Sequence, residues 1–537
     1  MPAPVIYFDL GNTLVFGPTG DKTPFADAVV TIEALWLRGY RIGLLSDQSP
    51  GTTIADVRLK LTDYGLEEFR FDVITISSEF SPPIYKPDAQ IFQTALTKAG
   101  HTSASSQTVF VTETLDHIEA ARTLGWRAIH KPFGTSCTSA SGECIETLDE
   151  LLDLFPPLAI DVFMRDNTGD DGDEPSSGAF WNSPDLWVRN QNDDAFSHQN
   201  PIAGQDNWFM ARVHNRGVGI ARNVLIWHKV QEWAGTQFVY PDDYWPYTAL
   251  TGAQVDPGES TVAKVVWPAD QVPAEGTHAC WTSAAIINGD AIATPAHVWD
   301  SNNLAQKNLT IIEMEAGGEA EMMVAIGARA VLRDQFTILE FWQSRRGPKL
   351  GAHLSGHVPR ALANAAMRAR KIQRDPIVKR RPSPVSLRFI DQSRVEILGV
   401  ASNDGDDMIL DLAPGSQLDM RAKQPAGGRQ PVFQRPLAPL TARLIETKDG
   451  ASAVAFSDHD ASGIELGLRP GEVIRTRLRL VAPKTTRPGD RMDVDLVQRN
   501  ADGTIVGGIT VSIRIIERPK RKSRRKPKST GKGSTKS

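Results

Sequence analysis

The first 155 residues alternate between short apolar runs and longer amphipathic stretches. Apolar runs of the kind found in strands buried on both faces of a sheet lie at residues 5–8, 41–45, 72–76, 108–111 and 127–130. Apolar residues at helical spacing predict helices at residues 25–38, 54–64, 89–99 and 116–124. This alternation predicts an α/β domain built on a doubly wound parallel sheet.

Polar side chains follow these strands at the points where each strand ends. Asp9 comes directly after the first strand, and Ser46 ends the second. Lys86 precedes the helix at 89–99, and Glu113 follows the strand at 108–111. A carboxylate at the carboxyl end of a parallel strand lies where open α/β sheets bind their ligands. The pattern predicts a site at this edge of the sheet, and a simple turn-capping role for Asp9 is the alternative.

The ordered set of an Asp, a Ser, a Lys and an acidic cluster resembles the four motifs of the haloacid dehalogenase-like (HAD) hydrolase superfamily. The resemblance covers about residues 4–155. It implies a Rossmannoid fold in which Asp9, Ser46 and Lys86 are the catalytic residues. A carboxylate such as Asp9 attacks phosphorus or carbon to form a covalent ester. Lys86 would then neutralise the crowded negative charges.

The resemblance also implies a metal ion next to the nucleophile. Its ligands would be Asp9, the main-chain carbonyl of Gly11, Glu113 and Asp116, and oxygen ligands of this kind suit Mg²⁺. The turn residues Asn12 and Thr13 are expected to bind the substrate. The implied reaction is the Mg²⁺-dependent hydrolysis of a phosphomonoester.

Two of the four motifs depart from those of the superfamily's phosphatases. Gly11 stands where these enzymes usually carry a second Asp, the general acid/base, and Thr112-Glu113 stands where Gly-Asp is usual. General acid/base catalysis contributes roughly 10²–10⁴-fold to a rate, so the sequence predicts a slow phosphatase or none. The alternative hypothesis is a catalytically inactive HAD-like domain in a multidomain binding or scaffold protein.

The spacing of the motifs leaves no room for an inserted cap domain. Between Asp9 and Ser46 there is space for a loop, a helix and a strand, and between Ser46 and Lys86 for one more such unit. The resemblance therefore implies a minimally capped domain with an open site, which suits a large phosphorylated substrate. Pro156-Pro157 closes this domain, which we assign to residues 1–157.

From residue 158 onward, short strands with frequent turns replace the helices. This pattern predicts antiparallel β-sandwiches at residues 158–315 and 385–517. The run ARVHNRGVGIARNVLIWHKV resembles bacterial immunoglobulin-like adhesion-type modules. These domains are expected to bind a protein partner or to shape the substrate entrance. The sequence pattern assigns no fold to the linking region at 316–384, apart from a basic helix expected at 358–372.

Composition adds constraints on compartment and partners. Three cysteines argue against a disulfide framework and fit a reducing compartment. No N-terminal signal and no apolar run of about 18 residues is visible, so a cytoplasmic protein without a membrane span is expected. The net charge of −5 predicts no polyanionic partner. The tail at 518–537, basic over its first half, is expected to be disordered and to bind polyanions weakly and without specificity.

Two further features have a chemical and a structural interpretation. The acidic turn at 166–173 offers carboxylates for Ca²⁺ but lacks the distal Glu of the twelve-residue pattern, so a solvated turn is the alternative. The tryptophans between residues 181 and 245 would form either a carbohydrate platform or the core of the first sandwich.

Overall fold

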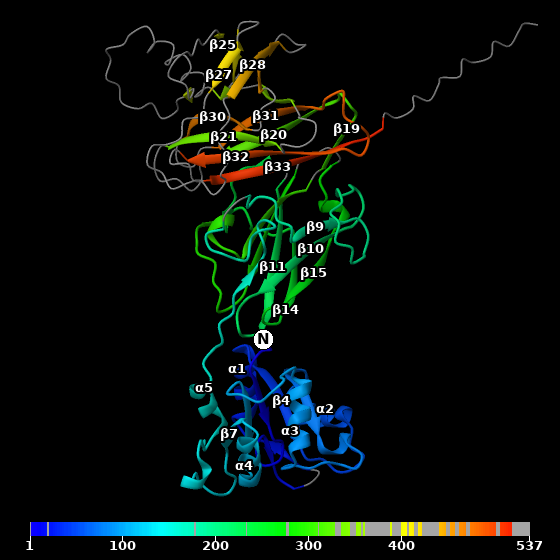
Figure 1. Cartoon of the computed structure of the whole chain (residues 1–537), viewed down its shortest axis with the longest axis vertical. Coiled ribbons are helices and arrows are strands. Elements are labelled where there is room, and N and C mark those ends of the chain that lie inside the picture. The colour runs from blue at the N-terminus through cyan, green and yellow to red at the C-terminus, as the bar shows by residue number, and fades with distance from the viewer. Residues whose placement is uncertain are drawn as a thin grey trace, which may run out of the picture. The chain divides into compact units, whose positions relative to one another are not determined.

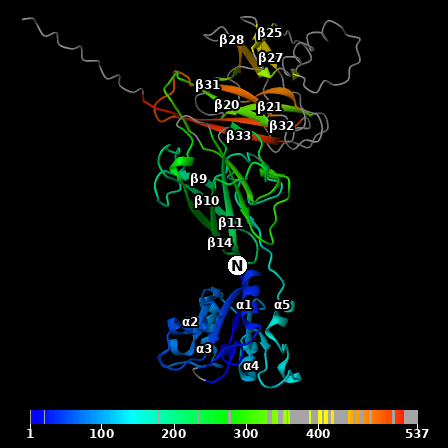
Figure 2. The same cartoon turned by 180° about the vertical axis from the view of Figure 1, so that it is seen from behind.

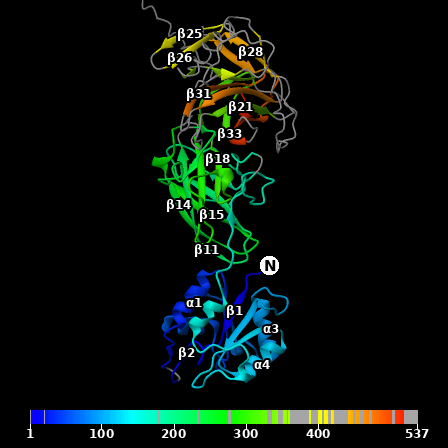
Figure 3. The same cartoon turned by 90° about the vertical axis from the view of Figure 1, so that its left-hand side faces the viewer.

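The protein is described by a computed structural model and falls into two compact units. The first unit comprises Met1–Glu232 and Phe238–Leu309, and the second comprises Trp233–Gln237 and Thr310–Ser537. Their elements are labelled in Figure 1 and seen from two other directions in Figure 2 and Figure 3. The structure describes residues 2–18, 21–176, 179–231, 234–274, 279–309, 311–327, 335–343, 351–355, 358–359, 387–388, 399–404, 407–412, 417–420, 440–446, 452–456, 461–468, 473–500 and 505–517.

A five-stranded sheet forms the centre of the N-terminal domain (Figure 1). Its strand order is β5-β4-β1-β6-β7, and every neighbouring pair is parallel. The strands are β1 (Val5–Phe8), β4 (Arg41–Ser46), β5 (Phe71–Ile76), β6 (Thr108–Thr112) and β7 (Arg127–His130). The predicted α/β domain with a parallel sheet is confirmed.

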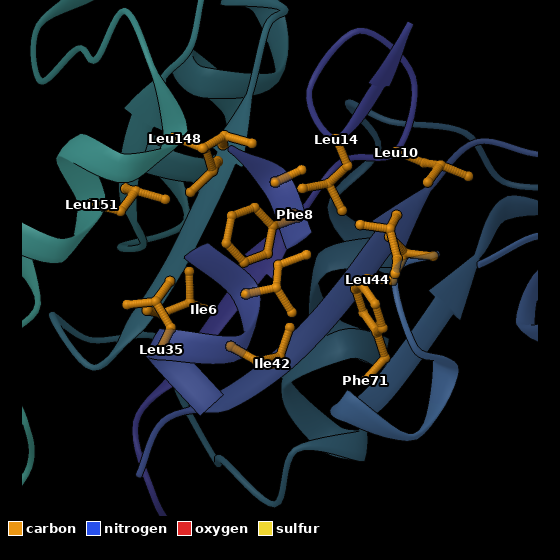
Figure 4. Close-up of a cluster of buried hydrophobic side chains, with 14 of the residues drawn as sticks. Ile6, Phe8, Leu10, Leu14, Leu35, Ile42, Leu44, Phe71, Leu148 and Leu151 are labelled. Carbon is orange, nitrogen blue, oxygen red and sulfur yellow. The ribbon is translucent and has the colours of Figure 1, made fainter. Parts of the chain in front are cut away.

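Helices cover both faces of this sheet because successive residues of a strand point to opposite sides. Ile6 and Phe8 of β1 belong to one buried cluster, to which α1, α2 and α5 contribute (Figure 4). Val5 and Tyr7 belong to a second cluster, to which α3 and α4 contribute. The helices are α1 (Ala28–Leu37), α2 (Ile54–Asp63), α3 (Ala89–Lys98), α4 (Leu115–Thr123) and α5 (Leu151–Leu154).

The connections beside the carboxyl edge of the sheet are short. Between β1 and α1 the chain forms a two-stranded hairpin of β2 (Val15–Phe16) and β3 (Thr23–Pro24). Between β4 and α3 it forms α2, η1 (Glu68–Arg70), β5 and η2 (Ser77–Glu79). Neither connection contains an inserted domain in the described part of the chain.

Two antiparallel sheets follow in the first unit. One has the order β15-β10-β8 with β9 also paired to β10, and the other has the order β14-β11-β16-β18. Their inner faces share one buried cluster that includes Phe209, Trp267 and Trp281. The elements here are β8 (Val162–Phe163), β9 (Leu186–Arg189), β10 (Asn207–Asn215), β11 (Ala221–Gln231), β13 (Val239–Tyr240), β14 (Ala249–Val255), β15 (Ser260–Trp267), η5 (Ala269–Gln271), β16 (Cys280–Ile286), β17 (Ala296–His297), η6 (Val298–Asp300) and β18 (Leu304–Asn308).

Some of the tryptophans between residues 181 and 245 lie in the core, and others lie at the surface. Trp181 and Trp187 are buried, as core packing requires, whereas Trp245 is 54% exposed. The ring of Trp245 lies 5.4 Å from that of Trp227. Trp233 lies outside the described residues.

His228 on β11 is fully buried in the core of these two sheets. Its ring stacks on Phe209 at 5.2 Å and meets Trp281 edge-on at 5.4 Å. Nδ1 lies 2.7 Å from the hydroxyl of Ser283. A charged imidazolium in this apolar place would lose its hydration, so the site favours the neutral ring.

We therefore expect His228 to make the protein less stable in acid. Burial lowers the pKa of His228 from 6.5 to about 3. The unfolded chain then binds this proton at a higher pH than the folded chain does. The free energy of unfolding should fall as the pH drops from about 6.5 toward 3, by at most about 1.4 kcal/mol per pH unit for this group. Urea unfolding between pH 7 and 4 should show a flatter dependence for His228→Gln, and parallel curves would contradict the assignment.

The second unit is mostly antiparallel β structure. Its sheets have the orders β12-β20-β31-β22-β29-β28-β27, β19-β33-β32-β21-β30-β24 and β23-β26-β25. The strands are β12 (Ala234–Gly235), β19 (Ile311–Met314), β20 (Glu319–Gly327), β21 (Gln335–Gln343), β22 (Gly351–Ser355), β23 (Val358–Pro359), β24 (Leu387–Arg388), β25 (Gly399–Asp404), β26 (Asp407–Leu412), β27 (Gln417–Met420), β28 (Leu440–Glu446), β29 (Ser452–Phe456), β30 (Ala461–Leu468), β31 (Val473–Val481), β32 (Arg491–Asn500) and β33 (Ile505–Ile515).

Two expectations fall largely outside the described residues of this unit. Of the basic helix expected at 358–372, only β23 is described, and it is a strand. The basic tail at 518–537 also lies outside the described residues. Among the helices that are described, none is long and apolar enough to span a membrane.

A disulfide in the N-terminal domain corrects the expectation drawn from the cysteine count. Cys137 and Cys144 are bonded, with their Cα atoms 5.9 Å apart. The backbone of His130 hydrogen-bonds to Glu143 and Ile145, which folds the loop back beside β7. A low cysteine count argues against a framework of several bridges but does not exclude one local bridge.

The acidic turn at 166–173 is partly buried, so the solvated turn is wrong for two of its residues. Asp166 is fully buried and accepts a hydrogen bond from Ser176, and burial raises its pKa well above the ordinary value. Asp170 is 8% exposed and accepts hydrogen bonds from the backbone N–H groups of Asp166 and Gly172. These carboxylates therefore organise their own loop.

Candidate active site

Asp9 lies at the point where the strand order of the sheet changes direction. It directly follows β1, whose neighbours are β4 on one side and β6 on the other. Its backbone N–H donates to the carbonyl of Val111 at 3.0 Å, which extends the strand pairing by one residue. Open α/β sheets bind ligands at this switch point, outside the carboxyl ends of the strands.

The carboxylate of Asp9 forms a buried ion pair with Lys86. Lys86 Nζ lies 2.5 Å from Asp9 Oδ2, and both residues are 6% exposed. Lys86 Nζ also donates to the carbonyl of Leu45 at 2.9 Å, and its backbone N–H donates to Asp47 at 3.0 Å. The second oxygen of Asp9 accepts from the backbone N–H of Leu10 at 2.7 Å. These contacts fix the orientation of the carboxylate.

A second carboxylate, that of Glu113, lies beside the first. The hydroxyl of Thr112 lies 3.3 Å from Asp9 Oδ2 and 3.2 Å from Glu113 Oε2, so it faces both groups. Thr13 donates from its buried hydroxyl to Glu113 Oε2 at 2.8 Å. His130 Nε2 lies 3.0 Å from the carbonyl oxygen of Glu113. The turns after β1 and β6 are thus tied together around two acidic side chains.

Ser46 and Asn12 form no hydrogen bond with Asp9 or Glu113 in the described structure. Ser46 is buried at the end of β4, and its hydroxyl accepts from Gln48 Nε2 at 3.0 Å. Asn12 adopts a left-handed backbone conformation with φ of 57°, and its N–H donates to the carbonyl of Val15 at 2.6 Å. Their roles toward a substrate stay predictions.

The first turn of α4 turns His117 rather than Asp116 toward the site. Asp116 is exposed and forms no hydrogen bond or ion pair with Asp9 or Glu113 in the described structure. His117 Nδ1 lies 3.8 Å from Asp9 Oδ2. Burial, and then the nearby ammonium of Lys86, lower the pKa of His117. One step along a helix rotates a side chain by about 100°, so the two neighbours face different surroundings.

The site offers two carboxylates to the implied Mg²⁺ ion. In the described part of the chain, no group of three or more His, Cys, Asp and Glu side chains is arranged to hold a metal ion. The carboxylates of Asp9 and Glu113 nevertheless both face the hydroxyl of Thr112. Mg²⁺ is commonly bound through one or two carboxylates and keeps several waters. The carboxylates of Asp9 and Glu113 fit an ion bound in this way.

Comparison of the sequence with models of protein families and with curated proteins gives no match. Among solved structures, an uncharacterized protein from Listeria monocytogenes serotype 4b is 21% identical, with a TM-score of 0.24, over 28% of this chain and 97% of that one. A HAD-superfamily hydrolase from Ehrlichia chaffeensis is 12% identical, with a TM-score of 0.23, over 29% and 96%. An L-2-haloacid dehalogenase is 19% identical, with a TM-score of 0.20, over 25% and 56%. Likeness at this level carries no statement about activity.

Proposed function

We propose that the N-terminal domain is a hydrolase that cleaves phosphomonoesters through a covalent intermediate on Asp9. The observation that carries this proposal is the buried pair of Asp9 and Lys86, 2.5 Å apart at the carboxyl edge of β1. The carboxylate of Glu113 beside it supports the same proposal, since two neighbouring carboxylates could hold the Mg²⁺ ion that would offset the negative charge of a phosphoryl group.

The proposed reaction has two steps. A carboxylate oxygen of Asp9 attacks phosphorus while the bond from phosphorus to the leaving oxygen breaks, and that oxygen takes a proton from water. Water then attacks the phosphorus of the phosphoaspartyl group, which releases inorganic phosphate and restores Asp9. Lys86 neutralises the carboxylate and the phosphoryl charge as they approach, and Ser46 would donate to a phosphoryl oxygen. A Mg²⁺ ion held by Asp9, Glu113 and the Gly11 carbonyl would supply further charge neutralisation when bound.

The short connections around the site support a substrate that is large or exposed. The chain between β1 and β4 offers only a hairpin and α1, and no inserted domain covers the site in the described residues. The phosphoryl group would then belong to a protein or to another sizeable molecule, which the antiparallel β domains would help to bind. A cytoplasmic location stays a prediction.

The absence of a side chain at Gly11 favours a second candidate function. Without an acid at this position, the domain would bind a phosphorylated or acidic partner and not turn it over. The whole chain would then serve as a binding or scaffold protein.

Hydrolysis of p-nitrophenyl phosphate separates these two candidates. We expect turnover that requires Mg²⁺ and stops with EDTA, and a phosphoryl group on the peptide that contains Asp9 after rapid acid quench and mass spectrometry. No turnover, no labelled peptide and no Mg²⁺-dependent rise in Tm would contradict the hydrolase and favour the scaffold.

A further inference from the structure

The space beside Gly11 is taken by the ammonium group of Lys22. A Cβ built on Gly11 would lie 3.1 Å from Lys22 Nζ. Apart from the chain neighbours of Gly11, no other heavy atom of the described structure lies within 4 Å of that point. A cation therefore stands where the resemblance to the HAD superfamily leads one to expect a second carboxylate.

The hairpin after β1 brings Lys22 to this place. Val15 pairs with Pro24 and Phe16 with Thr23, so the residue before β3 returns toward the start of the turn that follows β1. The base of the hairpin is held by packing of the Phe16 ring 4.9 Å from that of Phe25. The pairing of Thr23 with Phe16 thus fixes the backbone directly after Lys22.

Among the residues that the structure describes, no acid neutralises the charge of Lys22. Lys22 is half-buried, and in the described part of the chain no carboxylate lies within ion-pair distance of its Nζ. Lys86, by contrast, is paired with Asp9 at 2.5 Å. A half-buried cation without a paired acid, beside Gly11 in the turn that follows a predicted nucleophile, can attract an anionic ligand.

We propose that Lys22 faces the leaving-group oxygen of the substrate and stabilises the negative charge that develops there. This inference rests on the proposed function of Asp9. Lys22 keeps its proton throughout the reaction, and the leaving oxygen is protonated by water. A fixed cation aimed at developing charge in a partly desolvated site stabilises the transition state more than the ground state. Lys22 would thus compensate in part for the acid that Gly11 lacks.

The side chain at position 22 can be tested without disturbing Asp9. We expect Lys22→Ala to reduce kcat/KM by roughly 10²-fold for phenyl phosphate and by less for p-nitrophenyl phosphate, whose leaving group needs less stabilisation. Lys22→Arg should retain most of the activity because it keeps a positive charge. Lys229→Ala, which removes another half-buried lysine on β11, should behave like the wild type. All variants should keep the wild-type Tm.

Binding of orthovanadate provides a readout that does not depend on turnover. We expect its Kd, measured by calorimetry, to rise about tenfold in Lys22→Ala and to stay unchanged in Lys229→Ala, which corresponds to about 1.4 kcal/mol. If the wild type turns over substrate and Lys22→Ala matches it in both rate and Kd, the role of Lys22 is wrong while the hydrolase stands. If the wild type shows no turnover, the proposed hydrolase function is wrong. If the Kd of orthovanadate is then also the same in Lys22→Ala and the wild type, the role of Lys22 is wrong as well. A Kd that rises would then support Lys22 as the cation of an anion-binding site.

Discussion

Replacing Asp9 with Asn is expected to reduce hydrolysis of an aryl phosphate by roughly 10⁴–10⁶-fold, the scale on which removal of a covalent nucleophile acts. An amide oxygen does not form a phosphoryl ester under these conditions. The side-chain oxygen of Asn still accepts the hydrogen bond that Leu10 now donates at 2.7 Å to Asp9. The amide NH₂ group, however, would face the ammonium of Lys86 in place of the oxygen that lies 2.5 Å from it. Steady-state kinetics with p-nitrophenyl phosphate measures the loss.

The same substitution should also destabilise the domain. Lys86 is buried, and without a carboxylate its Nζ keeps only uncharged partners in the described structure, the carbonyl of Leu45 at 2.9 Å and the ring of Phe110 at 5.5 Å. Removing one member of a buried ion pair costs about 3–5 kcal/mol because the other charge is left uncompensated. We expect the double variant Asp9→Asn/Lys86→Met to regain much of this stability in urea unfolding while activity stays absent.

This pair of variants separates loss of chemistry from loss of fold. Asp63→Asn provides a matched control, because Asp63 is an exposed acid at the end of α2 in the same domain. It should leave both turnover and unfolding unchanged. Turnover that persists in Asp9→Asn would show that the reaction does not pass through this carboxylate.

The position of Asp9 was predictable because it follows from strand order, whereas Lys86, which lies between η2 and α3, was expected at the site only from the family resemblance. An apolar run that ends in an Asp predicts a buried strand with a carboxylate at its carboxyl end, and the carboxyl ends of parallel strands share one edge. Glu113 could be placed near Asp9 for the same reason, since β6 pairs directly with β1. These inferences need only local pattern and the rules of parallel sheets.

The rest of the site depends on orientation, which local pattern does not define. Asp116 and His117 are neighbours in the sequence, yet the helix turns one outward and the other toward Asp9. Lys22 reaches the space beside Gly11 only because a short hairpin folds back over the turn. Neither the inward orientation of His117 nor the place of Lys22 has a sequence signal beyond a basic residue in the loop that follows a strand-end Asp.

In the antiparallel region the sequence predicted strands but not the polar contacts between them. Residues 161–165, 185–189 and 207–215 each show strand character, and β8, β9 and β10 lie in or overlap these segments. Asp185, for example, pairs with Arg165 and His214, which lie far from it in the sequence. Contacts of this kind depend on which strands are neighbours, so the sequence pattern alone does not predict them.

Asp185 shows how much stability such a contact can carry. Its side chain is fully buried just before β9. It accepts hydrogen bonds from the backbone N–H of Arg165 at 2.9 Å, from the guanidinium of Arg165 at 2.6 and 2.9 Å, and from His214 at 3.0 Å. Burial alone would raise the pKa of Asp185, but the hydrogen bonds from His214 and Arg165 outweigh it and hold the pKa below the ordinary value.

We expect Asp185→Asn to lower the free energy of unfolding by about 3–5 kcal/mol, because it leaves a guanidinium and a backbone N–H of Arg165 without the carboxylate. The loss should be present at neutral pH and shrink in acid. The folded pKa of Asp185 is lowered, so its contribution exists above the unfolded pKa near 3.9 and disappears as the pH falls through the folded value. Urea unfolding at pH 7 and at pH 3 measures both effects. Asp171→Asn, an exposed acid of the neighbouring turn, should change neither value, and equal stability of Asp185→Asn and the wild type at pH 7 would contradict the role of this carboxylate in the fold.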